Sequence, residues 1–231
     1  MDNKTVKRLA FGVMFNHSFS ILDEWGKIAD DLLYSKNKKG IGFSPSYFPS
    51  ISQEYTTTRR LSNEGLGFSL ELSSNNLVYT HTIQDDFEKE YAEFVNRVES
   101  CLIPKIIEKY ELVTQRLGMV FVCKIEEPFI KRFKKKYFSE HAEDITDCRF
   151  AIRSVTPEGL LLTSNNDYIN KIYTIGNLDN TLRGISFDYQ LYFNPRQPEI
   201  KGKIAPFFKT SKDCFFDEIL KGERCEKEEG S

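Results

Sequence analysis

The chain has 231 residues, of which 40% are hydrophobic and 29% are charged, a balance typical of a soluble globular protein with one large domain or two small ones. Its 32 basic and 34 acidic residues leave a formal net charge of -2, which argues against a protein attracted as a whole to nucleic acid or to acidic membranes. The five cysteines are widely spaced and form no C-x-x-C pair, which argues against a disulfide framework and against a zinc knuckle.

The start of the chain, MDNKTVKRLAF, has no apolar run of the kind found in signal peptides. No stretch of the sequence approaches the roughly 18 apolar residues of a membrane span. Cys101 and Cys123 lie within apolar patterns and are expected to be small core residues. We therefore expect a protein of the reducing cytoplasm with no membrane segment.

Apolar alternation and helical spacing predict the elements of the first half. Ser20 and Asp23 have the spacing of a capping box and predict a helix from residue 20 to about residue 35. A longer helix begins at Asp85, and Pro104 should kink or split it, because proline lacks a backbone donor and clashes with the preceding turn. Strands are expected over residues 8–15, 53–60, 66–72 and 77–83, the last two as a hairpin.

Residues 113–125, VTQRLGMVFVCKI, are predicted to form the central strand of the fold. One face of this strand is apolar throughout, and the other is apolar in the middle and charged at both ends. We therefore expect a strand that is covered on both faces at its centre and reaches water at its tips. Arg116 and Lys124, near those tips, are candidate contact residues for a partner.

The second half begins with a basic amphipathic segment at residues 128–137 and ends with a helix capped by Thr210 or Ser211. Strands are expected over residues 147–155, 159–163, 168–175 and 183–193. The sequence therefore predicts an α+β fold, with a largely antiparallel sheet and helices packed on one face. Residues 1–127 would form an N-terminal α+β lobe and residues 128–231 a β-rich lobe with a closing helix. The two would be similar lobes that share one sheet in a compact unit.

The string QRLGMVFVCKIEEP resembles the pattern R-(L/I)-G-(L/M)-x-(Y/F)-(I/V)-N-(R/K)-I of a sporadically distributed prokaryotic family of unknown function. Other features of that family follow in the same order, namely the hairpin LELSSNNLVYTHT, the helix DDFEKEYAEFVNRV, the strand GISFDYQLYF with Asp188, and the closing CFFDEIL. Val120 and Cys123 stand where the family usually carries Arg and Asn, so the motif is expected to be structural here. The resemblance implies an α+β fold, a prokaryotic origin and a role in a mobile or defence-type gene cluster.

No recognised catalytic motif is present, and we predict no catalytic residue, metal or cofactor. The sequence has no phosphate-binding glycine loop, and its three histidines are isolated from one another. The densest group of potential metal ligands is more typical of a solvated acidic loop, because its spacing matches no standard site. It consists of His141, Glu143, Asp144, Asp147 and Cys148. Asp188 and Glu71 suggest an acidic pair on strands, but no lysine completes the nuclease pattern.

The basic segment EPFIKRFKKKYF is the best candidate for an electrostatic contact surface. Basic residues interleaved with aromatic residues can hold single-stranded nucleic acid by phosphate contact and stacking. The same spacing fits an amphipathic helix whose aromatic residues face the core, and this interpretation is favoured. The candidate contact residues are Lys131, Arg132, Lys134, Lys135 and Lys136.

Aromatic residues without a clear period lie in the proline-containing segment of residues 40–55. This segment either covers the sheet of its own chain or offers Tyr47, Phe48 and Tyr55 to a partner.

Taken together, the sequence favours a non-enzymatic accessory or regulatory protein that acts through protein–protein contacts and self-associates. The first alternative is a nucleic-acid-binding module that uses residues 131–136. The second is an enzyme with an unrecognised site, for which residues 141–148 are the first place to look.

Overall fold

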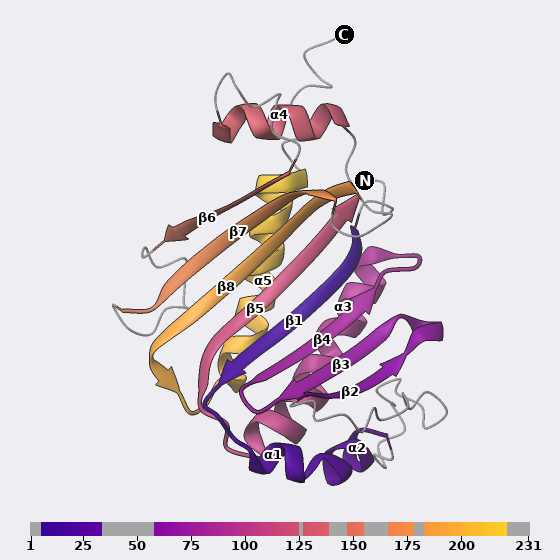
Figure 1. Cartoon of the computed structure of the whole chain (residues 1–231), viewed down its shortest axis with the longest axis vertical. Helices are drawn as coiled ribbons and strands as arrows, with labels where there is room; N and C mark the ends of the chain where they lie inside the picture. Colours follow the sequence, from indigo (N-terminus) through magenta and orange to yellow (C-terminus); the bar gives the residue numbers. More distant parts are fainter. Residues whose placement is uncertain are drawn as a thin grey trace.

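The computed structural model describes residues 6–33, 58–124, 127–138, 147–154, 166–177 and 183–220. The described strands form one antiparallel sheet in the order β2-β3-β4-β1-β5-β8-β7-β6 (Figure 1). They are β1 (Val6–Phe15), β2 (Thr58–Asn63), β3 (Phe68–Ser73), β4 (Asn76–Thr82), β5 (Thr114–Lys124), β6 (Cys148–Ser154), β7 (Tyr168–Asn177) and β8 (Arg183–Gln197). The predicted α+β fold with an antiparallel sheet is confirmed, and β5 lies in the middle of it.

The helices of the described part pack on one face of the sheet and along its ends (Figure 1). They are α1 (Ser20–Asp23), α2 (Trp25–Leu33), the 3-10 turn η2 (Glu64–Leu66), α3 (Phe87–Arg97), the π-helix η3 (Val98–Glu108), α4 (Glu127–Phe138), α5 (Lys201–Phe215) and the π-helix η6 (Phe216–Leu220). None of these helices is both long enough and apolar enough to cross a bilayer.

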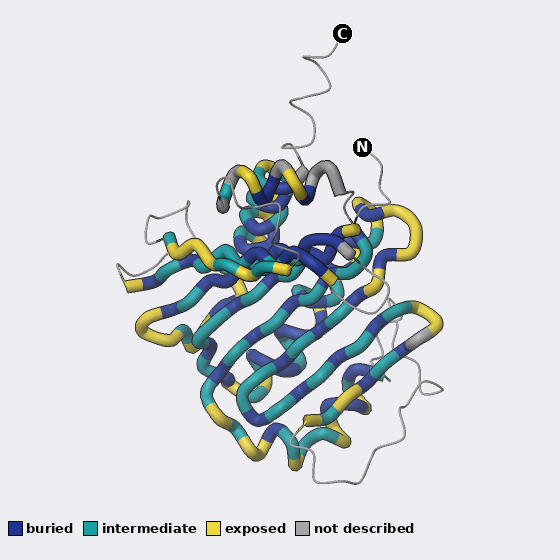
Figure 2. Tube along the Cα trace, turned by 45° about the horizontal axis from the view of Figure 1, so that its top comes forward, coloured by how far each residue is buried: buried dark blue, intermediate teal, exposed yellow. Residues whose placement is uncertain are grey.

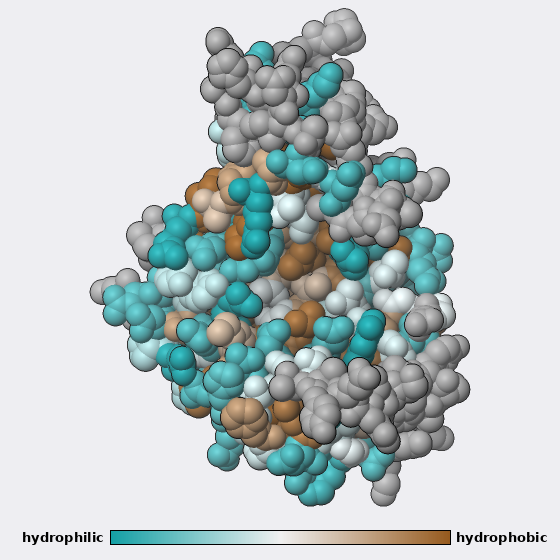
Figure 3. All heavy atoms as spheres, viewed as in Figure 1, coloured by the Kyte–Doolittle hydropathy of each residue, from teal (hydrophilic) through white to brown (hydrophobic). Residues whose placement is uncertain are grey.

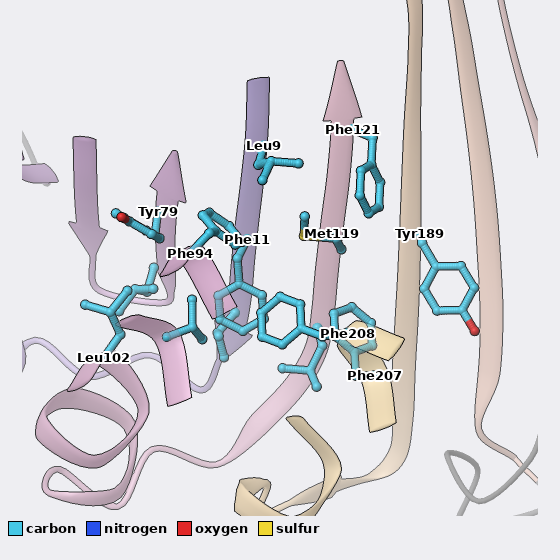
Figure 4. Close-up of a cluster of buried hydrophobic side chains, with 14 of the residues drawn as sticks. Leu9, Phe11, Tyr79, Phe94, Leu102, Met119, Phe121, Tyr189, Phe207 and Phe208 are labelled. Carbon is cyan, nitrogen blue, oxygen red and sulfur yellow. The ribbon is translucent and has the colours of Figure 1, made fainter. Parts of the chain in front are cut away.

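The core lies between the sheet and the layer formed by α3, η3 and α5. On β5, Leu117, Met119 and Phe121 have no exposed surface, as the alternation of the sequence predicts. Phe121 stacks on Phe215 of α5, with ring centroids 4.4 Å apart. Figure 4 shows the neighbouring part of this core, where Phe11 of β1 meets Phe208 at 5.2 Å. The layer is therefore held mainly by aromatic burial and packing.

The other face of β5 differs from the prediction. The sequence predicted cover on both faces at the centre. Val122 is buried on this second face, but Gly118 and Val120 are only partly buried there. In the described part of the chain the helices lie on one face, and Figure 2 shows buried and half-buried residues alternating along the strands. An antiparallel sheet can leave one face to water. Among the described residues, side chains of neighbouring strands shield the apolar middle of β5 on this face.

The two halves of the chain repeat one order of elements. Each half runs strand, helix, three strands, helix, and the sheet order is correspondingly symmetric about β1 and β5. Gly12 pairs directly with Gly118, and the segments around them, FGVMF and LGMVF, are similar. The second repeat begins at β5, whereas the sequence analysis placed the boundary between lobes after residue 127. Because β1 and β5 pair with each other, both repeats share one sheet and one core.

Two local predictions were wrong, and one of two alternatives in a third is excluded. Ser20 does not cap its helix, since Phe19 is the N-cap and the Ser20 hydroxyl lies 3.1 Å from that of Ser18. Pro104 does not split its helix, which continues as a π-helix on both sides of it, and the Pro104 carbonyl accepts a hydrogen bond from the Lys109 amide. The last helix begins at Lys201 rather than near residue 210.

The first turns of α5, which the sequence analysis did not predict to be helical, contain a proline and a glycine. Pro206 and Gly202 both disfavour a helix in isolation. The buried residues nevertheless recur at helical spacing, and the gain from burying them outweighs the local propensity. They are Ile204, Phe207, Phe208, Ser211 and Phe215.

We predict that Phe121→Ala lowers the free energy of unfolding by about 3–5 kcal/mol, because it opens a cavity between β5 and α5. Val120→Ala, at the adjacent position on the opposite face, should lower it by only about 1 kcal/mol. Guanidinium denaturation followed by circular dichroism measures both values. Equal losses for the two variants would contradict the assignment of one buried and one open face.

Candidate functional site on the open face of the sheet

A hollow lies on the face of the sheet opposite the helices (Figure 3). Its volume is about 450 Å³, and its lining comes from the adjacent strands β4, β1, β5, β8 and β7. The lining residues are Arg8, Ala10, Thr80, Val120, Val122, Thr174, Asn177 and Ser186. In Figure 3, hydrophobic residues lie in the middle of this face, and many of the coloured residues around them are hydrophilic. The hollow is therefore shallow and open, with a lining that is partly apolar and partly polar.

Small residues lie near the centre of the sheet, and Ala10 among them lines the hollow. Gly12 and Gly118 face each other across β1 and β5, and Ala10 is the next residue on the same face. A Cβ atom added at Gly118 would lie 3.8 Å from Oδ1 of Asp188 and 3.9 Å from the Gly12 carbonyl oxygen. The Asp188 carboxylate therefore closes over Gly118, where a side chain would otherwise stand.

A chain of hydrogen bonds runs along this face beside the hollow. Arg116 Nη1 donates to the Tyr192 hydroxyl at 3.3 Å, and that hydroxyl donates to Gln190 Oε1 at 3.1 Å. Gln190 Nε2 then donates to Asp188 Oδ2 at 2.5 Å. Burial raises the pKa of Asp188, while the Gln190 bond and the guanidinium groups of Arg116 and Arg149 oppose this rise. Asp188 is thus a poorly solvated carboxylate within a cationic neighbourhood.

An aromatic ladder forms the wall next to these groups. The rings of Tyr168 and Tyr192 stack at 4.6 Å with an angle of 10° between their planes. The Arg153 guanidinium lies 4.3 Å from the Tyr168 ring centroid, and that of Arg116 lies 5.7 Å from the Tyr192 ring centroid. The rings are therefore already engaged in cation–π contacts, and they serve as a rigid wall.

The basic segment forms α4 and packs much as an amphipathic helix should. Ile130 and Phe133 are buried, and the Phe133 ring lies 5.6 Å from that of Tyr173 on the sheet. Lys131 and Lys135 are exposed, but Lys134 is only 3% exposed and cannot face a partner. The side chains of Arg132 and Lys136 lie outside the described part. The contact surface predicted here is therefore reduced to two described lysines.

The remaining sequence candidates are placed as follows. Arg116 and Lys124 both lie on the open face of β5, Arg116 half-buried and Lys124 exposed. Glu71 and Asp188 do not form an acidic pair, because four strand spacings, roughly 19 Å, separate them. Glu71 instead lies 3.6 Å from the Arg60 side chain.

Two other candidate sites fall outside the described residues. They are the aromatic residues Tyr47, Phe48 and Tyr55, and the ligand-like residues 141–146. Within the described ranges, no three His, Cys, Asp or Glu side chains are grouped in a way that would hold a metal ion.

A buried histidine cluster was missed by the sequence analysis. His81 Nε2 lies 2.7 Å from Glu90 Oε2, and its Nδ1 lies 3.4 Å from Arg97 Nη1, which fits a neutral ring that donates from Nε2. The Glu90 carboxylate also accepts hydrogen bonds from the amides of Gln84 and Asp85. His81 lies two residues after Tyr79 on β4, so both side chains lie on the core face of the sheet. This spacing in the sequence could have placed His81 in the core. Since it is 2% exposed, the cluster fastens β4 to α3 and is closed to substrates.

Comparisons with known proteins give no assignment. No protein-family model matches this chain, and no curated protein is significantly similar to it in sequence. The resemblance to the prokaryotic family therefore stays a prediction of the sequence.

We predict that the His81 cluster makes folding stability fall in mild acid. Burial lowers the pKa of His81 below its ordinary 6.5, so the unfolded chain takes up a proton more readily than the folded one. The stabilising contribution is complete above pH 6.5 and is lost as the pH falls below that value. The lowered pKa of Glu90, which follows from its amide and His81 hydrogen bonds, adds a further loss below its ordinary 4.5.

Urea denaturation at pH 7.5 and pH 5.5 measures this effect. His81→Gln should lose less stability between the two pH values than the natural chain, because glutamine does not titrate. His17→Gln, which removes an exposed histidine, is the matched control. An unchanged pH dependence in His81→Gln would show that the cluster does not behave as described.

Proposed function

We propose that this protein acts by binding a ligand or partner on the open face of its sheet, without catalysing a reaction. The observation that carries the proposal is the hollow, which five adjacent strands line and no described helix covers. Its floor contains Ala10, Val120 and Val122, three apolar residues on the side of the sheet that faces away from the core. Apolar surface at the bottom of a preformed concavity, with polar groups around it, is typical of binding sites.

The described histidine in the core and two of the described cysteines are poorly suited to catalysis. His81 is buried and held by Glu90 and Arg97, so it is unable to reach a substrate. Burial raises the pKa of the Cys101 thiol to about 11 and also raises that of Cys148, which leaves both as weak nucleophiles.

The accessory or regulatory role that the sequence favours agrees with this proposal. We keep a protein partner, self-association, a cytoplasmic location and a defence-type role as predictions of the sequence. The nucleic-acid alternative based on residues 131–136 is weakened by the burial of Lys134. Any nucleic acid bound by this protein is better sought on the open face.

Site-specific photo-cross-linking in cells tests the proposed binding surface. Benzoylphenylalanine placed at Val120 or at Ser186, both in the lining of the hollow, should give a covalent adduct of defined mass after irradiation. Ser62, on the same face but at edge strand β2, is the matched control and should give none. Intact mass spectrometry and gel mobility identify adducts of any chemical class.

The proposal fails if the two positions in the hollow give no more adduct than Ser62. Thermal unfolding of each purified variant shows whether the inserted side chain has disturbed the fold. A variant that unfolds cooperatively and gives no adduct counts against the proposal.

A further inference from the structure

Cations outnumber carboxylates on the open face, although the whole chain has a net charge of -2. The register places six basic and two acidic side chains at the described strand positions of this face. The basic residues are Arg8, Arg60, Arg116, Lys124, Arg149 and Arg153, and the acidic ones are Glu71 and Asp188. The charge is therefore separated between surfaces, and this face attracts anions.

Three of these cations surround the hollow. Arg8 lines it directly, Lys124 follows the lining residue Val122 by two positions, and Arg149 pairs with Thr174, also in the lining. Within the described part of the chain, no carboxylate forms an ion pair with Arg8, Lys124 or Arg149. Lys124 and Arg149 are exposed, so their charges remain available to a ligand.

The uncharged lining is suited to the same kind of ligand. Thr80, Thr174 and Ser186 provide hydroxyl groups and Asn177 an amide, and all of these can donate to phosphoryl oxygens. None of the described lining residues is a carboxylate, although Asp147 accepts a hydrogen bond from the backbone amide of Asn177. The apolar floor at Val120 and Val122 accommodates a weakly polar group such as a base or a sugar ring.

The distance over which the basic side chains are spread indicates that the ligand is a polymer. From Arg8 on β1 to Arg149 and Arg153 on β6 there are four strand spacings, or roughly 19 Å. A single phosphate group contacts only part of this distance, whereas successive phosphates of one strand can follow it. A hollow of about 450 Å³ is large enough for one nucleotide unit.

We infer that the open face binds single-stranded nucleic acid, with one nucleotide in the hollow and neighbouring phosphates on Arg8, Lys124 and Arg149. This inference rests on the proposed function, since it names the occupant of the same surface. Two described carboxylates lie beside the hollow and oppose the ligand. Asp188 pairs with the lining residue Val120, and Asp147 accepts a hydrogen bond from the backbone amide of the lining residue Asn177. Removing the charge of Asp188 should strengthen binding, whereas removing Arg8 or Arg149 should weaken it.

Fluorescence anisotropy with labelled 12-nucleotide single-stranded RNA and DNA tests the inference on the full chain. Arg8→Ala and Arg149→Ala should each lower affinity about tenfold, because each removes a charged hydrogen bond. Arg60→Ala, which removes a cation at the far edge strand, is the matched control and should change affinity less than about twofold. Asp188→Asn should raise affinity. With three phosphate contacts, raising the salt from 50 to 200 mM should weaken binding about 20-fold.

Two competitors separate this ligand from related ones. Binding of ATP without binding of either oligonucleotide would overturn the assignment of a strand in favour of a free nucleotide. Binding of poly-glutamate with the same dependence on Arg8 and Arg149 would overturn it in favour of an acidic peptide. Circular dichroism of each variant confirms that the fold is retained.

The photo-cross-linking experiment distinguishes failure of this inference from failure of the proposed function. If Val120 forms adducts but no oligonucleotide binds at 50 mM salt, the inference is wrong and the open face binds something else. If neither result is obtained, both are wrong.

Discussion

The pairing of β1 with β5 is the constraint on which the rest of the structure depends. These two strands join the repeats, and their register sets Gly12 opposite Gly118 at the centre of the sheet. One face of the pair carries Phe11, Leu117 and Phe121, and it directs α3, η3 and α5 to the same side. The period of two along each strand then leaves the small residues on the other side. The core and the hollow are thus two consequences of one register.

Aromatic residues buried on the helix side of the sheet allow the two faces to differ in polarity. Because α5 supplies Phe207, Phe208 and Phe215 to the helix side, that side provides the packing that holds the layers together. The open face is then free to carry partly buried polar groups, among them Asp188, whose pKa is raised by burial. An excess of cations on this face opposes folding through charge repulsion, and a bound anion would relieve that repulsion.

Regular alternation made the fold predictable from the sequence. The central strand, the hairpin and the antiparallel sheet all follow from periods that local residues show, as at Leu117, Met119 and Phe121. Helix α5 was placed too late, because tertiary burial of Phe207 and Phe208 overrides the propensities of Pro206 and Gly202. The hollow was not predictable, since Arg8, Thr80 and Ser186 come from distant parts of the chain and meet only through strand order. Asp188 was noticed in the sequence, but its neighbours Gln190, Tyr192 and Arg116 could not be identified without the register.

The most direct test of this account is a methyl NMR titration with a 12-nucleotide single-stranded RNA. Each of the strands β1 and β5 carries methyl groups on both faces, so the fold itself supplies the control. The account predicts that resonances of Ala10, Val120 and Val122 shift, while those of Leu9 and Leu117 on the helix side stay in place. Shifts confined to Ile130 on α4, or spread equally over both faces, would contradict it.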